Sequence, residues 1–275
     1  MKIVEYEPSR VRDVADLMAR VWGKPADEAE LDWFYGGNPV APASVLLAEE
    51  GGRVVASVAI SFLRMSVGGE TVTAGMPVHL ATDPAFRGRG IFRELEGANE
   101  ERARQTGARL LFVVPTPASA SVLRRRLGWA PLAPLRVWAR AALPFRIRSQ
   151  HVDRFDRQVT SCYLPASAAG VARDAAWLNW RFADAPRRYT IVANGGYAIL
   201  GSRGRLGVLV ATGGRLAAPT GLAAIGAPPP WERGRYLRAG WLPTLRTFAL
   251  LGKSLDPRFR LPMQPHFELG DLDFF

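Results

Sequence analysis

Apolar and polar positions follow two recognisable periods at the start of the chain. Residues 2–6 alternate as a half-buried strand does, and from Val11 onward apolar residues recur at helical spacing. Ser9 is expected to cap that helix. Two apolar runs, 44–49 and 53–62, are separated by the turn signal EEGG and predict an antiparallel hairpin. The chain therefore opens with a strand, an amphipathic helix and a hairpin.

The same pattern extends to residue 142. The further elements that it predicts are a strand at 71–81, a helix at 92–105 ended by Gly107, a strand at 108–114, a helix at 118–127 and a strand at 135–142. A loop at 82–91 joins the first of these strands to the first of these helices. The order of elements indicates a protein of the α/β (α+β) class.

Two stretches of the first half recur in the second half. LDWFYGGNP at 31–39 resembles LNWRFADAP at 178–186, and RRRLGWAP at 124–131 resembles RYLRAGWLP at 235–243. The members of the two pairs are separated by different numbers of residues, so a second copy must be shorter than the first. The second copy also lacks an RGRG segment. We interpret the echo as an internal duplication, with chance matching as the alternative. The expected domains are 1–145 and 160–275.

Composition indicates which ligands the protein can bind and which classes of protein can be excluded. The chain has 275 residues and a net charge of +11, carried mainly by arginine, which suits a phosphorylated cofactor or nucleic acid. No apolar run is long enough for a membrane span, and Glu5 and Glu7 interrupt the start, so we expect a cytoplasmic protein without a membrane partner. A single cysteine, Cys162, and three scattered histidines predict no metal site.

The stretch ATDPAFRGRGIFREL at 81–95 carries the candidate chemistry. Arg87-Gly88-Arg89-Gly90 lies where the predicted strand ends and the helix begins. The first amides of a helix have no helical partner, and the helix dipole adds partial positive charge. Glycine allows an anion to approach the backbone closely. The loop is therefore expected to bind a diphosphate.

Arg87 and Gly90, at this spacing, resemble motif A of the GNAT acyltransferases, and the element order of residues 1–142 is similar to the GNAT core. The resemblance implies a GNAT fold, with a central mixed, mostly antiparallel sheet flanked by helices, followed by a second, smaller GNAT-like α/β unit. It also implies acetyl-CoA as cosubstrate. The cofactor-binding positions carried over are Leu80, Ala81, Thr82, Arg87, Gly88, Arg89, Gly90, Ile91 and Phe92, with Ser119 and Ser121 toward the thioester end.

Some of these positions have a second interpretation or depart from the family pattern. Phe92 stands where the family usually has glycine or alanine, so its ring must pack inward. Ser119 is equally well placed to cap a helix. The tyrosine that serves many GNAT enzymes as general acid is replaced by Arg124, and Tyr236 of the second copy is expected to be a packing residue. The general acid is therefore unassigned.

Candidate residues for proton transfer and acceptor binding come from two other stretches. His79, on the strand before the loop, is the candidate general base, because an imidazole titrates near ~6.5; a packed structural histidine is the alternative. Aromatic residues between the first helix and the second strand are expected to meet the acceptor. Tyr35 and Asn38 are favoured over Trp33, which recurs as Trp180 and so suggests a structural role.

These features predict an N-acetyltransferase. The acetyl group would pass from acetyl-CoA to a primary amine of a small molecule, such as an amino sugar, an aminoglycoside or an amino acid, by direct attack in a ternary complex. One alternative is an aminoacyl transferase that uses aminoacyl-tRNA, although the retained CoA loop does not favour a nucleic-acid partner. The other is a non-catalytic CoA-binding module.

Overall fold

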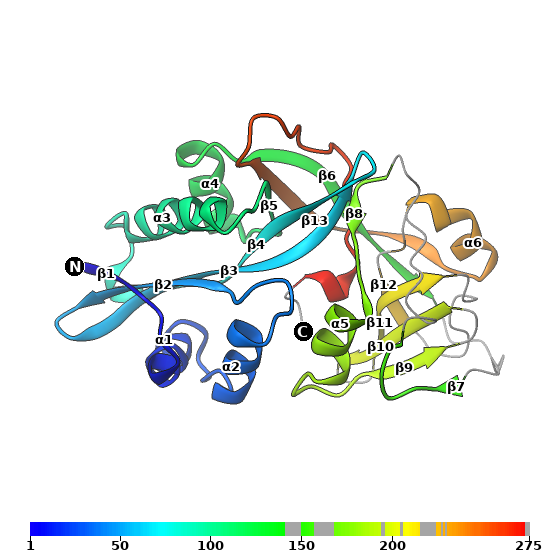
Figure 1. The fold of residues 1–275 in the computed structure, drawn as a ribbon, viewed down its shortest axis with the longest axis horizontal. Coiled ribbons are helices and arrows are strands. Elements are labelled where there is room, and N and C mark those ends of the chain that lie inside the picture. The colour runs from blue at the N-terminus through cyan, green and yellow to red at the C-terminus, as the bar shows by residue number, and fades with distance from the viewer. Residues whose placement is uncertain are drawn as a thin grey trace. The chain divides into compact units, whose positions relative to one another are not determined.

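The computed structural model describes residues 1–140, 150–156, 168–193, 196–203, 206–214, 224–226, 228 and 230–272. Contacts divide the chain into two compact units. The first comprises residues 1–63, 72–131 and 251–261, and the second comprises residues 64–71, 132–250 and 262–275. Each unit contains a sheet with helices packed on it (Figure 1).

The sheet of the first unit has the order β1-β2-β3-β4-β5-β13. The pairs β1–β2, β2–β3 and β5–β13 are antiparallel, whereas β4–β5 is parallel. The predicted hairpin is confirmed as β2 paired with β3 across the EEGG turn. The bounds are Lys2–Glu5 for β1, Ser44–Glu50 for β2, Arg53–Val67 for β3, Glu70–Thr82 for β4, Leu110–Val113 for β5 and Leu242–Ser254 for β13, of which Leu251–Ser254 pair with β5.

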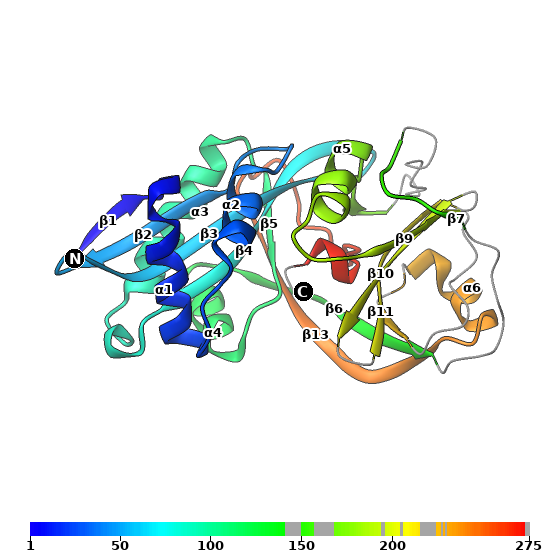
Figure 2. The same cartoon turned by 90° about the horizontal axis from the view of Figure 1, so that it is seen from below.

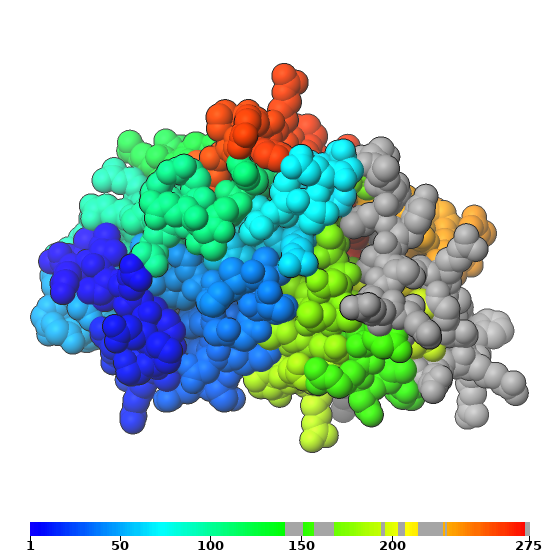
Figure 3. Space-filling model, viewed as in Figure 1, coloured from blue at the N-terminus to red at the C-terminus, as the bar shows by residue number. Residues whose placement is uncertain are grey.

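Helices cover both faces of this sheet. α1 (Val11–Trp22) and α2 (Glu28–Gly36) lie on one face, and α3 (Ile91–Gln105) and α4 (Pro117–Arg126) lie on the other (Figures 1 and 2). In the space-filling view, the blue residues of α1 and α2 form an outer surface of the unit (Figure 3). The helical predictions for α1, α3 and α4 are therefore confirmed to within a few residues.

α1 begins differently from the sequence expectation. Pro8–Arg10 forms a 3-10 turn, and the cap position of α1 is Arg10, which makes no side-chain capping bond. The prediction of Ser9 as the cap is wrong, because proline starts the short turn two residues earlier than the apolar period suggests. Val14, Leu17 and Met18 are buried, as the period predicts.

α2 is a helix that the hydrophobic pattern does not reveal. Asp27 caps it by accepting a hydrogen bond from the Ala29 amide at 2.9 Å. The aromatic residues of LDWFYGGNP form its body, and Phe34 and Tyr35 are buried. Adjacent aromatic side chains spread the apolar surface around the helix, so the helical period is weak.

The sheet of the second unit repeats the pairing pattern of the first. Its order is β7-β9-β10-β11-β12-β6, followed by the first part of β13. Again one pair near the end, β11–β12, is parallel, while its neighbours β10–β11 and β12–β6 are antiparallel. The bounds are Ala130–Arg140 for β6, Gln150–His151 for β7, Thr190–Ala193 for β9, Gly196–Arg203 for β10, Leu206–Gly214 for β11 and Ala224–Gly226 for β12; β8 (Gly170–Val171) pairs with the end of β3.

Neighbouring residues of β11 show how this sheet is covered. Leu209 packs in a cluster with Tyr236 of α6 (Arg233–Arg238). Val210 points to the opposite face, as alternation along a strand requires, and lies close to Gly270. Phe182, which follows α5 (Ala175–Leu178), contacts the same glycine. The second unit is therefore also a sheet with helical segments on both faces.

Local structure strengthens the interpretation of a duplication. Asp174 caps α5 through the Trp177 amide at 2.8 Å, just as Asp27 caps α2. Gly128 and Gly240 both have positive φ, at 73° and 83°, immediately before a buried tryptophan. In each unit, the strand after the parallel pair comes from the other half of the sequence, β13 in the first and β6 in the second.

Glu268 and Asp271 of the closing stretch belong to a buried ionic network inside the second unit. Arg173 donates to Glu268 at 2.6 Å and, through two nitrogens, to Asp271. Burial lowers the pKa of Arg173, but the two carboxylates outweigh it and keep the guanidinium charged. Breaking one member of such a network leaves an uncompensated buried charge.

The two units do not divide the sequence at one point. The predicted domains, 1–145 and 160–275, stay a prediction, since compact units defined by contacts need not be independently folding domains. By contacts, the first unit ends at Pro131 and gains residues 251–261. Most of the predicted boundary region, 141–149 and 157–167, lies outside the described residues.

Candidate functional site

The RGRG loop forms the expected turn from strand to helix. β4 ends at Thr82, a 3-10 turn spans Pro84–Phe86, and Gly90 is the cap residue of α3. Gly90 has φ +81°, a conformation that is costly for residues with a side chain. A Cβ placed on Gly90 would meet only the Arg93 side chain, at 3.8 Å. The start of α3 is therefore open for a ligand to reach its backbone.

Charge at this opening is positive. Arg87 is exposed and donates to the Thr82 carbonyl at 3.2 Å. One nitrogen of Arg89 donates to both carboxylate oxygens of Glu50, at 3.0 and 3.1 Å, and the guanidinium lies over the Phe86 ring. The first amides of the fifteen-residue helix α3 add their own partial charge. Phe92 packs against the buried clusters, as its departure from the family pattern requires.

Asp83 holds the start of this loop in place. Its side chain accepts from the Ala85 amide at 3.1 Å, from Arg20 at 2.8 Å and from Arg53. Burial alone would raise the pKa of Asp83, but these hydrogen bonds more than offset it and hold the pKa below its usual value. The carboxylate is therefore ionised and fixes the direction in which the chain leaves β4.

Asp83→Asn is expected to weaken the acetyl-CoA binding that the sequence predicts by roughly tenfold, because the amide keeps the Ala85 contact but loses the charge that holds Arg20 and Arg53. Titration calorimetry measures the change. Asp13→Asn, which breaks the partly exposed pair with Arg10, is the matched control and leaves binding unchanged. Equal affinity of Asp83→Asn and the wild type would contradict the anchoring role.

β4 and β5 pair only briefly, near the start of β4 and away from the loop. Their parallel register joins Ala74 to Leu110 and Gly75 to Leu111, whereas β4 continues to Thr82. The last residues of β4 therefore extend past their pairing with β5. Backbone groups of Leu80 and Thr82, both partly exposed, lie on this extension and can bond an extended ligand.

His79 interrupts β4 with an unusual backbone. Its φ is +52°, and it is the only non-glycine residue with positive φ in the described part of the chain. Its Nδ1 lies 3.0 Å from the Tyr35 Oη, and its ring packs against Phe34 and Tyr35. If Nδ1–H donates to Tyr35, then Nε2 is the nitrogen that can accept a proton. Strained backbone of this kind is concentrated at functional sites.

The predicted acceptor residues differ in accessibility. Asn38 is 4% exposed, and its amide nitrogen donates to the Phe62 carbonyl at 2.7 Å and to Ser61 at 3.2 Å. Those bonds support a structural role for Asn38. Tyr35 is also buried and contacts His79 instead of solvent. Trp33 is half-buried, which makes it the most accessible of the three.

The serines near the expected thioester end lie on the first two turns of α4. Thr116, not Ser119, is the cap, and it accepts from the Ser119 amide at 3.3 Å. The expectation that Ser119 caps this helix is wrong because Pro117 already occupies the first helical position. The Ser119 hydroxyl donates back to the Thr116 carbonyl at 3.2 Å, and Ser121 is exposed.

A buried acidic pair on α3 is absent from the sequence predictions. Glu96 is 0% exposed, and neither of its carboxylate oxygens has a hydrogen-bond partner among the described residues. One turn later, Glu100 accepts from Trp129 at 2.6 Å and from Lys253. Burial and, secondarily, Glu100 raise the pKa of Glu96 to about 8. The sequence contains one signal for this buried acid: Glu96 directly follows Leu95 on the face of the helix that carries the apolar residues.

Glu96 makes stability depend on pH. The pKa of Glu96 is higher in the folded chain than in the unfolded chain. Its contribution to the free energy of unfolding is therefore complete below pH ~4.5 and is lost as pH rises through 8. Glu96→Gln removes this term, so the decline in the free energy of unfolding from pH 5 to 8 becomes smaller by ~3 kcal/mol. Urea denaturation at both pH values measures it, with Glu94→Gln on the exposed face as control. An unchanged decline in Glu96→Gln would refute the assignment.

Tyr236 cannot serve readily as an acid. It is 4% exposed in the second unit, and burial, with Glu268 next, raises its pKa above the ordinary value. Its hydroxyl lies 3.4 Å from Thr212 Oγ1. Tyr236→Phe is expected to leave kcat unchanged and to cost about 1 kcal/mol of stability. A large drop in kcat with an intact fold would make Tyr236 a participant.

Two further features concern the part of the chain that the structure describes. Among the helices of this part, none combines the length and the apolar character needed to cross a bilayer. Within the same part of the chain, no three His, Cys, Asp or Glu side chains are grouped to hold a metal ion.

Comparisons with known proteins agree with this geometry. Residues 2–132 match the family described as acetyltransferase (GNAT) domain. A GCN5-related N-acetyltransferase from Kribbella flavida is 16% identical over 93% of this chain and 72% of its own, with a TM-score of 0.69. A putative acetyltransferase from Pyrococcus horikoshii is 11% identical over 95% of this chain and 92% of its own, with a TM-score of 0.61.

A tandem GNAT protein from the clavulanic acid biosynthesis pathway is similar along nearly its whole length. It is 13% identical over 93% of this chain and 99% of its own, with a TM-score of 0.59. No curated protein matches the sequence. The likeness to solved structures shows the GNAT fold with a second unit. Residues 2–132, just under half of the chain, therefore form an acetyltransferase domain of the GNAT type.

Proposed function

We propose that the protein transfers an acetyl group from acetyl-CoA to a primary amine of a small molecule, as an amino sugar, an aminoglycoside or an amino acid would offer. The observation that carries the proposal is the open, positively charged start of α3 at Gly90, beside the extended end of β4. The start of α3 would bind the diphosphate of the cosubstrate, and Leu80 to Thr82 would bind its extended arm.

The chemistry requires a neutral amine next to the thioester. Its nitrogen attacks the acetyl carbonyl in a ternary complex, so that a C–N bond forms and the C–S bond breaks. CoA leaves as its thiolate, and the proton lost by the amine passes to His79 Nε2 and then to solvent. The hydrogen bond between Nδ1 and Tyr35 would hold the required tautomer.

A separate acid for the departing thiolate is not part of the proposal. Arg124 occupies the usual position and is exposed at the end of α4. Tyr236 is buried in another unit with a raised pKa. A thiolate is a good leaving group at neutral pH, since a thiol's unperturbed pKa is about 8.5. Protonation by solvent after departure is sufficient.

Acceptor contacts are assigned to the aromatic segment of α2. Trp33 is half-buried and can stack on a sugar ring or hold a cationic amine before deprotonation. Asn38 and Tyr35 would hold this aromatic segment in place. Asn38 does so through its hydrogen bond to the Phe62 carbonyl, and Tyr35 through its hydrogen bond with His79. This order reverses the preference drawn from the sequence, because burial rather than residue type decides which side chain can reach a ligand.

Thiol release from acetyl-CoA, measured with a colorimetric reagent across a panel of amines, tests the proposal. The panel contains glucosamine, kanamycin and lysine, and each amine is paired with its N-acetylated form as control. Amine-dependent thiol release is the expected result. Acetyl-CoA binding without release for any amine would support the non-catalytic module instead, and RNA co-purifying at modest salt would support the tRNA-dependent alternative.

A further inference from the structure

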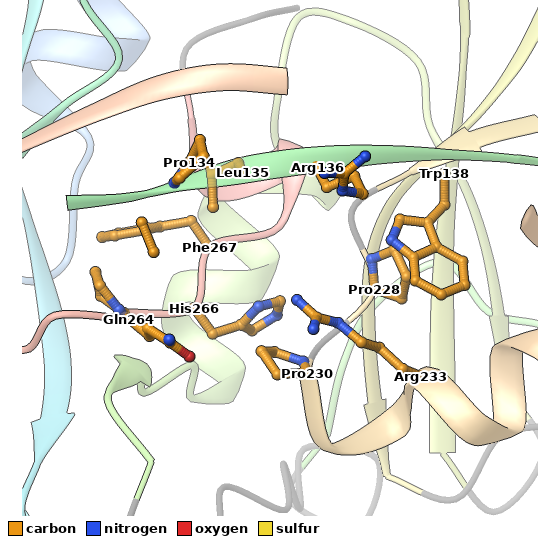
Figure 4. A pocket seen from close by; sticks show the side chains of 12 residues that line it. Pro134, Leu135, Arg136, Trp138, Pro228, Pro230, Arg233, Gln264, His266 and Phe267 are labelled. Carbon is orange, nitrogen blue, oxygen red and sulfur yellow. The ribbon is translucent and has the colours of Figure 1, made fainter. Parts of the chain in front are cut away.

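The second unit contains a pocket of about 160 Å³ that the proposed acetyl transfer does not use. β6 forms one wall, Pro228, Pro230 and Arg233 form another, and residues 264–267 form a third (Figure 4). Pockets for drug-sized ligands begin at roughly 300 Å³. This pocket is therefore too small for a CoA molecule and has the size for a compound with a single ring.

His266 places an unsatisfied polar atom at this pocket. The residue is 8% exposed, and its Nε2 is buried without a partner among the described residues. Its backbone amide donates to Ala169 at 2.7 Å, and its ring packs edge-on against Trp231 at 5.1 Å, so its position is fixed. Burial, together with Arg173 and Arg233, lowers the pKa of His266 to about 3. A buried unpaired nitrogen in a native fold calls for a partner.

The charge of the wall is positive. Arg136 and Arg233 line the pocket, and the described residues of its lining include no aspartate or glutamate. Arg233 makes no ion pair among the described residues, whereas Arg136 donates to the Thr244 carbonyl at 2.9 Å. The Arg233 guanidinium and the His266 imidazole are turned toward each other across the pocket (Figure 4). A guanidinium beside a neutral imidazole is an arrangement suited to one anionic group.

Apart from Gln264, the rest of the lining is apolar, and most of it is stiff. Trp138 and Phe267 contribute flat faces, and Pro228 and Pro230 flank Arg233. Proline and aromatic side chains lose little conformational freedom when a ligand binds, so the shape is already formed. Arg136 is already bonded to the Thr244 carbonyl, so the charged or polar groups turned toward each other are Arg233 and His266, a pair that suits one carboxylate better than a phosphate dianion bound by many donors.

We propose that this pocket binds a small organic carboxylate with a flat apolar body. The carboxylate would lie between the Arg233 guanidinium and the His266 imidazole, and the body would pack on Trp138 and the neighbouring prolines. Charge and shape thus select a monoanion of single-ring size. The site lies wholly in the second unit and does not depend on acetyl transfer.

Benzoate is the probe, and benzamide is its uncharged counterpart of the same shape. We expect calorimetry and ligand-observed NMR to detect benzoate but not benzamide binding to the full chain. Labelling of histidine side chains should show a shift of the His266 resonance at saturation. Equal binding of the two compounds, or no binding of benzoate, would overturn the proposal.

Arg233→Gln tests the charged contact. Arg233 is exposed, so the variant should fold, and circular dichroism checks this. Benzoate affinity should fall by at least about tenfold, the usual cost of losing a charged hydrogen bond. Arg238→Gln, on the same helix but outside the lining, is the matched control and should bind as the wild type does. Unchanged affinity in Arg233→Gln would place the anion elsewhere.

Discussion

The substitution Gly90→Glu is expected to weaken acetyl-CoA binding by more than about a hundredfold, or ~2.7 kcal/mol. Gly90 has φ +81° and lies at the cap of α3. A glutamate there would place a negative charge at the amides that the diphosphate needs, in a backbone conformation that costs a further ~1–2 kcal/mol for a residue with a Cβ. Titration calorimetry with acetyl-CoA measures the effect.

Gly107→Glu is the control for backbone strain. Gly107 follows the other end of α3, has φ +96°, and has no atom within 4 Å of an added Cβ. The two variants therefore carry similar strain and the same added charge, but only one is next to the loop. Equal loss of affinity in both would mean that destabilisation, not the loop, explains the result.

His79→Asn is expected to lower kcat by ~10²–10³, the usual contribution of general base catalysis, and to leave the dissociation constant of acetyl-CoA unchanged. Asparagine tolerates the positive φ of this position better than other residues do, so the β4 backbone should persist. Steady-state thiol release with the best amine of the panel measures kcat, and calorimetry measures binding.

Tyr35→Phe separates proton transfer from packing. The phenyl ring keeps the edge contacts with His79 and Tyr6, but the hydroxyl 3.0 Å from Nδ1 is lost. A smaller fall in kcat, of about tenfold, is expected because the imidazole tautomer is no longer held. If His79→Asn keeps nearly the activity of the wild type while its melting temperature falls, His79 is a packing residue.

Local patterns were sufficient for most of the first unit. The hairpin at β2 and β3 follows from two apolar runs with EEGG between them, and α3 follows from a helical period that ends near Gly107. α2 was missed because its aromatic residues surround the helix. The pairing of Leu251–Ser254 with β5 joins residues far apart in sequence, and no local pattern encodes it.

The candidate site shows the same limit. The loop could be predicted because glycines and a strand-to-helix turn are visible in sequence. The positive φ of His79 was not visible, because the fold imposes it on a residue that seldom adopts it. Burial of Asn38 and the neutral state of Glu96 also depend on neighbours from other elements. The sequence therefore identified candidate residues for the site, and packing determined which of these side chains can reach a ligand or exchange a proton.

The most direct test is calorimetric titration of the 275-residue chain with acetyl-CoA. The account predicts binding of one acetyl-CoA per chain, since the RGRG loop occurs only in the first half, and loss of that binding in Arg87→Ala, Gly90→Glu. No binding by the wild-type protein, or binding that survives in the double variant, would contradict the assignment of the loop at the start of α3 as the cosubstrate site.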